Sequence, residues 1–339
     1  GAGTDTMVMG NTVAMALDGA NRTTFTNVEG ITVTDAFNGT LNIKQISSAL
    51  DTVNLTLANA AIMAGGDQVT GSAGTLNVNI GNSSTSTDGV MGGAFTVVDS
   101  GSATTDSVVI SNTAKLSTGA NVDVFAGQNI TSTGYENVTI SSGAGTVGAG
   151  SVTSGRGADE ADIGTLTITP DDTSAAVSAT FTGTNALELQ SITTTSTGLM
   201  TVDASGMSAQ ASGTKSLVVV TTAHGTSGTG DITGSAGDDI IAIGNYKTTI
   251  DGGLGADSIT GSASDLGDSI TGGAGADTFK YASAQLTTLD TIAGGAGTDI
   301  ISTTDTAALV DDDFTNVSGV ETLQSEGTNG DFNLTLGSE

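Results

Sequence analysis

A nine-residue phrase that recurs between Gly234 and Ser302 constrains the fold of this chain more than any other feature. The phrase is Gly-Gly-x-Gly-x-Asp-x-apolar-x. Complete copies begin at Gly252, Gly272 and Gly294, and the copies around them are degenerate. One copy would carry little weight in a chain with 50 glycines, but several copies in nine-residue register indicate an internal repeat. Short repeats of this kind stack on one another, because each one buries its apolar face only against its neighbours.

The residue types of the phrase predict sharp turns that alternate with short strands. Glycine adopts positive φ without a Cβ clash, so the backbone turns tightly and its carbonyl oxygens point to one side. The aspartate adds a carboxylate, and the apolar residue two places later begins an inward-facing strand. Two phrases form one coil of about eighteen residues, so turns on the same edge recur at that interval. One edge then carries Asp239, Asp257, Asp277 and Asp299, and the opposite edge carries Thr248, Asp268 and Asp290.

These two rows are typical of a binding site for a hard cation. Stacked carboxylates and backbone carbonyls supply oxygen ligands only, and Ca²⁺ takes about six to eight of them at about 2.3–2.6 Å. Such a ligand set suits Ca²⁺ and not Zn²⁺. The sequence therefore predicts several calcium ions between successive turns. The alternative is a stack of Gly-Asp turns that binds no metal.

The stretch resembles the calcium-binding RTX nonapeptide repeat of proteins that are exported by type I secretion. The resemblance covers residues 231–302 of 339 and implies a parallel β-roll with Ca²⁺ between successive turns. Residues 243–251 depart from the motif, since they lack both the turn glycines and the aspartate. The metal ligands and turn glycines that the resemblance implies are Asp239, Asp257, Asp277, Asp299, Asp268, Asp290, Asp5, Gly237, Gly255 and Gly275.

The charge balance excludes several classes of partner. The chain has 36 acidic residues against seven Lys and Arg, which gives a formal net charge of −29. Nucleic-acid binding requires clustered basic residues, so we expect no nucleic-acid partner. Anionic membrane surfaces are disfavoured for the same reason. Because such charge repels itself in a compact state, we expect folding to be coupled to bound Ca²⁺.

The rest of the composition indicates a β-rich protein outside the membrane. Thr and Val favour strands, and Gly, Asn and Asp favour turns. With 37% hydrophobic residues the chain is too apolar to be disordered. The absence of Cys removes disulfides and thiolate metal sites. No apolar run approaches the roughly 20 residues that span a bilayer, and no signal peptide is visible. The chain begins without Met in mid-motif, so we expect a processed or trimmed piece.

A second, longer period links the two ends of the chain. Residues 1–8 (GAGTDTMV) match residues 295–302 (GAGTDIIS), and the likeness continues from 25–31 to 314–320 and from 38–43 to 329–334. We interpret this as one period of roughly 290 residues plus the start of the next, which is typical of a tandem array. The alternative is two unrelated uses of a common Phe-x-Asn-Val phrase.

Between residues 50 and 230, short alternating apolar segments follow one another, and Gly, Ser, Asn and Asp separate them. Alternation at period two indicates half-buried strands. The pattern favours an all-β fold, a right-handed parallel β-helix or β-solenoid with uneven loops. A β-sandwich is the rival, although tight hairpin signals are scarce. Residues 44–51 and 57–64 could form short helical turns. The strands expected here include 53–57, 76–80, 95–98, 108–110, 122–125, 138–140, 166–168, 187–189 and 217–220.

The sequence holds little that could support catalysis. The single histidine, His224, excludes zinc sites of the H-E-x-x-H kind, and no serine lies in a G-x-S-x-G elbow. Carboxylates are plentiful, but sugar-cleaving sites usually carry aromatic platforms, and this chain has no Trp. The G-x-G-x-D at 155–159 could hold an extra Ca²⁺, although a solvated acidic loop is favoured there, as it is for Asp311–Asp313. We therefore expect a protein that is not an enzyme.

The succession of short predicted strands with Thr- and Gly-rich segments between them resembles that of RTX-type surface-layer proteins of Gram-negative bacteria. It resembles that of large repeat adhesins and biofilm-matrix proteins almost as well. The resemblance implies a secreted structural protein of the cell surface that assembles with copies of itself into a layer or fibre. Outer-membrane polysaccharide is a further candidate partner. The alternatives are an adhesin segment and the non-catalytic part of a secreted enzyme. The expected organisation is residues 1–8 ending one motif, an irregular solenoid at 9–230, the calcium roll at 231–302 and the next repeat from 303 to 339.

Overall fold

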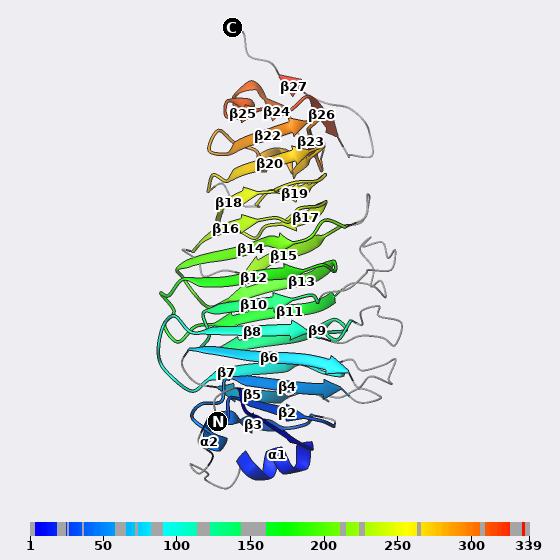
Figure 1. Cartoon of the computed structure of the whole chain (residues 1–339). Helices are drawn as coiled ribbons and strands as arrows, with labels where there is room; N and C mark the ends of the chain where they lie inside the picture. The colour runs from blue at the N-terminus through cyan, green and yellow to red at the C-terminus, as the bar shows by residue number, and fades with distance from the viewer. Residues whose placement is uncertain are drawn as a thin grey trace.

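The chain winds into one elongated solenoid with its first and last described residues at opposite ends (Figure 1). From β2 to β23, successive strands alternate between two facing sheets; among the described residues, sheet A has 13 strands and sheet B has 12, and both sheets are all-parallel. The structure is a computed structural model. It describes residues 4–18, 25, 27–35, 37–57, 66–71, 74–82, 91–113, 123–143, 161–210, 215–223, 228–262, 266–305, 309–325 and 334–335.

Sheet A consists, in spatial order, of β1 (Thr6–Met9), β2 (Gly30–Val33), β4 (Thr52–Leu57), β6 (Thr75–Asn82), β8 (Ser107–Asn112), β10 (Asn137–Ser141), β12 (Val177–Gly183), β14 (Leu199–Met207), β16 (Thr229–Thr233), β18 (Lys247–Asp251), β20 (Ser269–Gly275), β22 (Thr291–Gly297) and β25 (Val317–Ser318). Sheet B consists of β3 (Thr40–Asn42), β5 (Asp67–Gly71), β7 (Phe95–Asp99), β9 (Gln128–Thr133), β11 (Ala161–Thr169), β13 (Leu187–Thr194), β15 (Leu217–Ala223), β17 (Asp239–Ala242), β19 (Ser258–Thr260), β21 (Thr278–Tyr281), β23 (Ile300–Thr303) and β26 (Thr322–Ser325).

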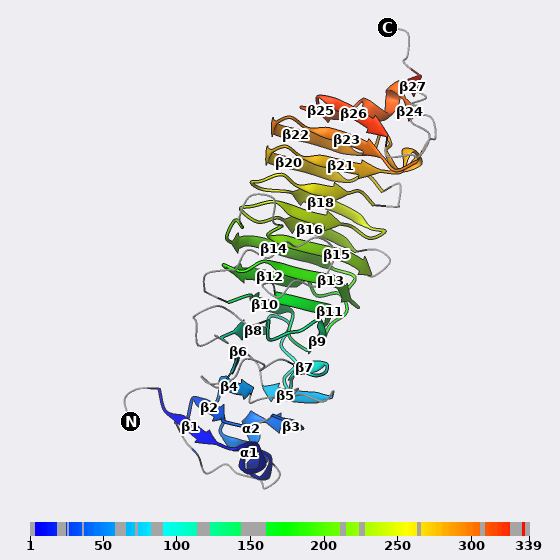
Figure 2. The ribbon, with the colours of Figure 1, turned by 90° about the vertical axis from the view of Figure 1, so that its right-hand side faces the viewer.

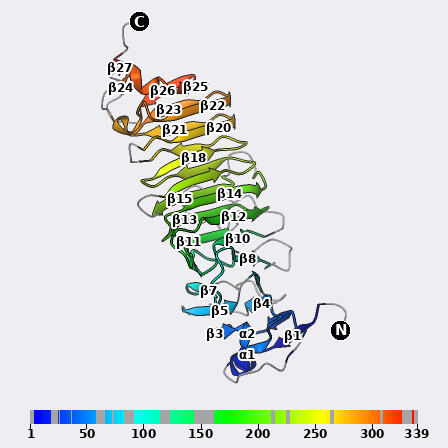
Figure 3. The ribbon, with the colours of Figure 1, turned by 90° about the vertical axis from the view of Figure 1, so that its left-hand side faces the viewer.

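Short elements lie at the ends and in the turns. Helix α1 (Asn11–Asp18) and helix α2 (Ile43–Ile46) lie at the N-terminal end, as the two side views show (Figures 2 and 3). The C-terminal end carries β24 (Leu309–Val310), which pairs with β27 (Leu334–Thr335), and the 3₁₀ turn η2 (Asp311–Phe314). A second 3₁₀ turn, η1 (Ser283–Gln285), follows β21. No helix among the described residues is long and apolar enough to cross a membrane.

The core is a set of apolar ladders between the two sheets. Strands alternate buried and partly exposed side chains, as in β7 and β10, because successive Cβ atoms point to opposite faces. In-register parallel pairing then places like positions above one another in successive coils. In sheet A, Ile31, Val53, Val78, Ile110, Ile140 and Phe181 form such a ladder, and in sheet B Val219, Ile241, Ile259, Phe279 and Ile301 form another.

The structure confirms the predicted parallel solenoid and rejects the β-sandwich, whose strands would pair antiparallel. Both sheets continue across residue 230 without a break: β14 pairs with β16, and β15 pairs with β17. The irregular coils and the nonapeptide coils therefore share one continuous stack. Of the two predicted helical segments, the first corresponds to α2, whereas 58–64 lie outside the described residues and Leu57 ends β4.

One predicted strand, 122–125, is wrong over its described residues. Val124 and Phe125 are buried but lie in a turn. The carboxylate of Asp123 accepts hydrogen bonds from the backbone N–H groups of Phe125 and Ala126, both at 2.9 Å. Ala126 takes a positive φ of 49°. A local aspartate turn of this kind competes with strand pairing, and here it prevails over the apolar alternation.

Candidate metal centre

The predicted aspartates stand where the chain enters a strand, on the two edges of the flattened solenoid. Asp239, Asp257, Asp277 and Asp299 (the Asp239 row) lie where the chain passes from sheet A to sheet B, at the starts of β17, β19, β21 and β23. Asp268 and Asp290 (the Asp268 row) lie where it passes back, before β20 and β22. The structure thus brings each row together on its own edge, as the spacing predicted.

Backbone hydrogen bonds hold the Asp239 row in register. The Oδ1 atoms of Asp257, Asp277 and Asp299 each accept the N–H of the equivalent aspartate one coil earlier. Asp239 N–H donates to Asp257 at 2.8 Å, Asp257 N–H to Asp277 at 2.9 Å, and Asp277 N–H to Asp299 at 2.9 Å. Asp299 N–H continues the row by donating to Oε2 of Glu321 at 2.8 Å. One carboxylate oxygen per coil is therefore fixed in place.

The second oxygens of this row distinguish complete copies of the phrase from the degenerate one. The Oδ2 atoms of Asp257, Asp277 and Asp299 are buried and have no hydrogen-bond partner. In the degenerate first copy, Ser235 replaces the second glycine, and its N–H donates to Oδ2 of Asp239 at 2.6 Å. Its hydroxyl donates to Oδ1 of the same carboxylate at 2.7 Å. The three complete copies thus leave an acceptor without a donor, which is costly in a protein interior.

Burial makes the charged form of these carboxyl groups unfavourable. It raises the pKa of Asp257 to about 8, with further contributions from the charges of Asp239 and Asp277, and it raises the pKa of Asp239 to about 6. The pKa of Asp277 is raised too, first by burial and then by the charge of Asp299. Lys215, whose amine donates to the carbonyl of Ala256 at 2.9 Å, opposes these shifts only in part. A bound cation would relieve the same penalty.

The turns need glycine because successive coils approach so closely that a Cβ atom would not fit between them. Gly255 and Gly275 have φ of 110° and 154°, and a Cβ on Gly275 would overlap the carbonyl oxygen of Gly255. A Cβ on Gly297 would overlap the carbonyl of Gly275 in the same way. Gly237, in the degenerate copy, differs, because its constraint is contact with the side chain of Ser216. The complete copies therefore stack backbone on backbone, with glycine carbonyls alongside the carboxylates.

The Asp268 row is arranged alike but has donors for its second oxygens. Thr248 N–H donates to Oδ1 of Asp268 at 2.9 Å, and Asp268 N–H donates to Oδ1 of Asp290 at 2.8 Å. The N–H of Ser262 donates to Oδ2 of Asp268 at 3.3 Å, and the N–H of Thr287 to Oδ2 of Asp290 at 2.8 Å. This row therefore fits a metal less well than the Asp239 row does.

Asp5 lies at the other end of the solenoid, far along the stack from the other predicted ligands (Figure 1). Its N–H donates to Oε2 of Glu29 at 2.8 Å, and its carbonyl accepts from Gly30 N–H at 3.1 Å. Asp299 and Glu321 form the same pair of bonds, with the Asp299 carbonyl accepting from Thr322 N–H at 3.0 Å. The two pairs make the same bonds, but they are not equivalent in the sequence match between the chain ends, because Glu29 stands opposite Ser318 there and because the first pair joins strands of sheet A and the second joins strands of sheet B.

Sequence reasoning missed acidic residues outside the glycine-rich stretch. Asp67, Asp106, Glu136 and Glu29 each stand at the start of a strand and accept a backbone N–H from the preceding coil, at 2.6, 2.7, 3.2 and 2.8 Å respectively. An acid followed by x-apolar-x-apolar is the available signal, as in DSVVI and ENVTI. The Gly-Gly-x-Gly-x-Asp pattern is absent around them, so the nonapeptide motif alone does not reveal this use of carboxylates.

The donor chemistry of the Asp239 row fits calcium. Its members present hard, buried oxygens in repeating register, together with glycine carbonyls. Over the ranges that the structure describes, no group of three or more Asp, Glu, His or Cys side chains is arranged to hold a metal, so ligation would draw on backbone carbonyls. The 3₁₀ turn η2 begins with Asp311, and its acidic residues are mostly exposed. His224 and the G-x-G-x-D at 155–159 lie outside the described residues.

Comparison with known proteins adds no name to this arrangement. No family model matches the chain, no curated protein matches it, and no solved structure matches it.

Proposed function

We propose that this chain is a calcium-dependent extracellular structural protein that assembles with copies of itself into a surface layer or an extracellular fibre. The observation that carries the proposal is the row of three buried Oδ2 atoms, on Asp257, Asp277 and Asp299, which lack donors in the three complete copies of the phrase. The same three copies stack glycine on glycine, so their carbonyls and carboxylates recur together at each coil.

Each part of the nonapeptide has its own task in this proposal. Oδ1 accepts an N–H of the preceding coil and fixes the carboxylate, which leaves Oδ2 for the ion. The glycines let successive turns approach until their carbonyls lie beside the carboxylates. Bound Ca²⁺ supplies the positive charge that offsets the repulsion within the row. Where Ca²⁺ is scarce, as in the cytosol, these coils stay loose for export, and at millimolar Ca²⁺ they lock.

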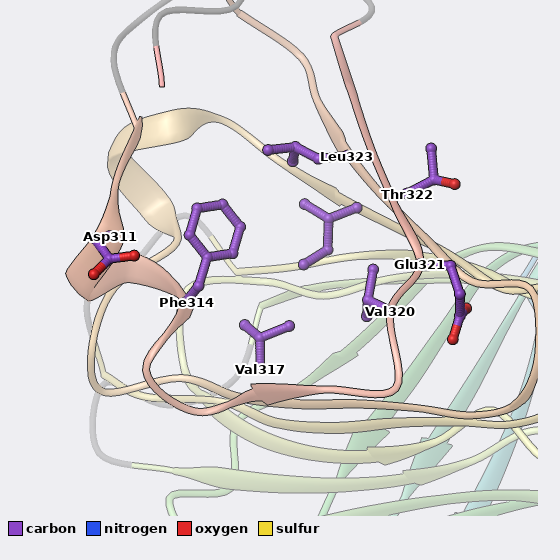
Figure 4. A pocket seen from close by; sticks show the side chains of 8 residues that line it. Asp311, Phe314, Val317, Val320, Glu321, Thr322 and Leu323 are labelled. Carbon is purple, nitrogen blue, oxygen red and sulfur yellow. The ribbon is translucent and has the colours of Figure 1, made fainter. Parts of the chain in front are cut away.

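The proposed assembly is supported by the outermost strands that the structure describes. Within the described residues, β1, β3, β25 and β26 each pair with a neighbour on one side, and a strand edge of this kind can pair with another chain. At the C-terminal end, a cavity of about 290 Å³ is lined largely by apolar side chains that point toward one another (Figure 4). They include Ile301, Phe314, Val317, Val320 and Leu323. A second copy of the chain stacked at this end would cover them.

Electron microscopy with circular dichroism tests the proposal. We expect the purified chain to form ordered lattices or fibres in millimolar Ca²⁺ and to lose them in excess EGTA. Folded single particles in Ca²⁺ would instead favour the adhesin segment. Unchanged β-structure and assembly in EGTA would overturn the calcium mechanism.

A pair of matched variants separates the metal row from general charge. Asp257→Asn with Asp277→Asn removes two carboxylates of the row and should abolish Ca²⁺-dependent assembly. Asp231→Asn with Asp251→Asn removes the same charge from exposed positions on β16 and β18, and should assemble as the parent chain does. Equal loss in both variants would point to overall charge rather than to the row.

A further inference from the structure

A buried tyrosine in the irregular coils points its hydroxyl into an acidic turn. Tyr135 follows β9, is 0% exposed, and its hydroxyl has no hydrogen-bond partner. The hydroxyl lies against Gly71 so closely that a Cβ on that glycine would overlap it. Gly71 is the in-register partner of Asp99 on the adjacent strand β7. The tyrosine therefore reaches back past the end of β7 to the end of β5, two coils away.

Two carboxylates bracket the turn that the hydroxyl faces. Asp99 ends β7, and Asp106 directly precedes β8, so residues 100–105 connect them. They are 7% and 3% exposed, and their side chains lie within hydrogen-bonding reach of each other. Oδ1 of Asp106 accepts the N–H of Gly74 at 2.7 Å. The other Asp106 oxygen has no partner, and neither Asp99 oxygen has a partner of good geometry, although the backbone N–H of Gly101 lies close enough to lower the pKa of Asp99. Two acceptors thus face each other with no donor between them.

The charged groups around this turn do not supply the missing donor. The two carboxylate oxygens of Glu136 accept hydrogen bonds from the N–H groups of Asp106, at 3.2 Å, and Asp171, at 3.1 Å. The amine of Lys44 donates to the carbonyl of Ser48 at 3.0 Å. Burial raises the pKa of Asp99, and the nearby charges of Asp106 and Asp171 raise it further. Burial and these two turn carboxylates, Asp99 and Asp106, also raise the pKa of the Tyr135 phenol, which keeps it neutral.

We propose that Asp99, Asp106 and Tyr135 form a second cation site, outside the nonapeptide coils, for a divalent ion that prefers oxygen. Three carboxylate oxygens of one turn and the phenol oxygen of the next coil are buried near one another, and two negative charges match the charge of the ion. Water and turn carbonyls would complete the six to eight ligands typical of Ca²⁺. The ion would fasten the coil of β7 and β8 to the coil of β9 and β10, in the cyan to green part of Figure 1.

Terbium luminescence tests this site directly, because Tb³⁺ is an oxygen-seeking probe of calcium-like size that tyrosine sensitises. The chain has three tyrosines and no tryptophan. In a Tyr246→Phe, Tyr281→Phe background, Tyr135 is the one remaining sensitiser. We expect saturable emission on excitation of tyrosine, displacement of that emission by Ca²⁺, and its complete loss on Tyr135→Phe. Absence of emission in this background would overturn the site.

Changes to the carboxylates distinguish a cation from a shared proton. Asp99→Asn with Asp106→Asn should weaken Tb³⁺ binding more than about tenfold, while circular dichroism stays that of the parent. Asp106→Asn alone keeps an oxygen for Gly74 N–H and should show the same loss if the double variant misfolds. The exposed Asp51→Asn serves as control and should bind as before. Unchanged affinity in the folded Asn variants would mean that the two carboxyl groups share a proton instead.

This inference stands apart from the nonapeptide proposal, and one variant separates their failures. Asp257→Asn with Asp277→Asn should leave the Tyr135-sensitised emission intact, because those residues lie many coils away. If emission disappears in that variant as well, the signal belongs to the nonapeptide coils, and the second site is rejected.

Discussion

The irregular coils before residue 230 and the nonapeptide coils after it use the same two-sheet stack but stabilise it differently. Strands of the first region reach nine residues, as in β11 and β14, and bury large side chains such as Phe181. Strands of the second region run from three residues in β19 to seven in β20 and β22, and most of them bury one apolar side chain, as β19 buries Ile259, although β21 buries Phe279 and Tyr281. Since apolar burial contributes about 25 cal/mol per Å², the shorter coils gain less from their core.

The difference shows what the glycines and aspartates contribute. The irregular coils can vary their turns because the core fixes each strand. The nonapeptide coils repeat the same turn with little variation. Both the close backbone approach and the carboxylate row depend on the same geometry in every coil. We therefore expect the first region to be stable without metal and the second to depend on it.

The largest effect of a substitution should come from the glycine stack. Gly275→Ala places a Cβ on the carbonyl of Gly255 at a φ of 154°, and we expect it to cost more than about 3 kcal/mol in the free energy of unfolding of the nonapeptide coils. Gly66→Ala is the control, with a φ of 85° and open space around it, and should cost only about 1–2 kcal/mol from backbone strain. Chemical denaturation in Ca²⁺ measures both. Equal costs would show that close stacking does not matter.

A smaller effect should appear in the pH dependence of stability, whose sign should differ between the metal-free and the metal-bound protein. In the ion-free protein the pKa of Asp257 is about 8, whereas an unfolded Asp titrates near 3.9. Between these values the folded chain binds more protons than the unfolded chain, so the free energy of unfolding falls as pH rises through this window. Thermal melting in EGTA should therefore give a higher Tm at pH 5 than at pH 8.

Saturating Ca²⁺ should reverse that trend, because protons then compete with the ion for the same oxygens. Melting curves for the nonapeptide coils at both pH values, with Ca²⁺ and with EGTA, give the four Tm values needed. The same pH trend in both conditions would mean that these carboxyl groups do not bind the ion.

The smallest effect should come from a single change of charge within the row. Asp277→Asn keeps an oxygen for the N–H of Asp257 and removes one buried charge. In EGTA it should stabilise the nonapeptide coils by about 1 kcal/mol, and in Ca²⁺ it should destabilise them by a similar amount. Asp231→Asn, on an exposed position, should do neither. A change of the same sign in both conditions would contradict the account.

The repeats made the architecture and the Asp239 row predictable from the sequence. The eighteen-residue interval between Asp239 and Asp257 places both on one edge, and their N–H to Oδ1 bond follows from that spacing. The strands of the irregular coils were predictable from apolar alternation, as in β7 and β10. The turn at Asp123 was not, because a local side-chain bond competes with the pattern there.

Two properties of the site could not be read from the sequence. Which carboxylate oxygens lack donors depends on local contacts: Ser235 donates both its N–H and its hydroxyl to Asp239, whereas glycine has no hydroxyl and the N–H of Gly253 donates to Asp251 instead. The meeting of Tyr135 with Asp99 and Asp106 depends on which turns lie on the same edge. The loops between those coils vary in length, so no fixed interval in the sequence predicts that these three residues meet.

Hydrogen exchange followed by mass spectrometry, with millimolar Ca²⁺ and with EGTA, tests the central claim most directly, because it resolves the two regions within one chain. The account predicts that amides of β17, β19, β21 and β23 lose protection in EGTA, while those of β12 and β14 keep it. Equal protection of the nonapeptide coils in both conditions would contradict the claim that calcium orders them.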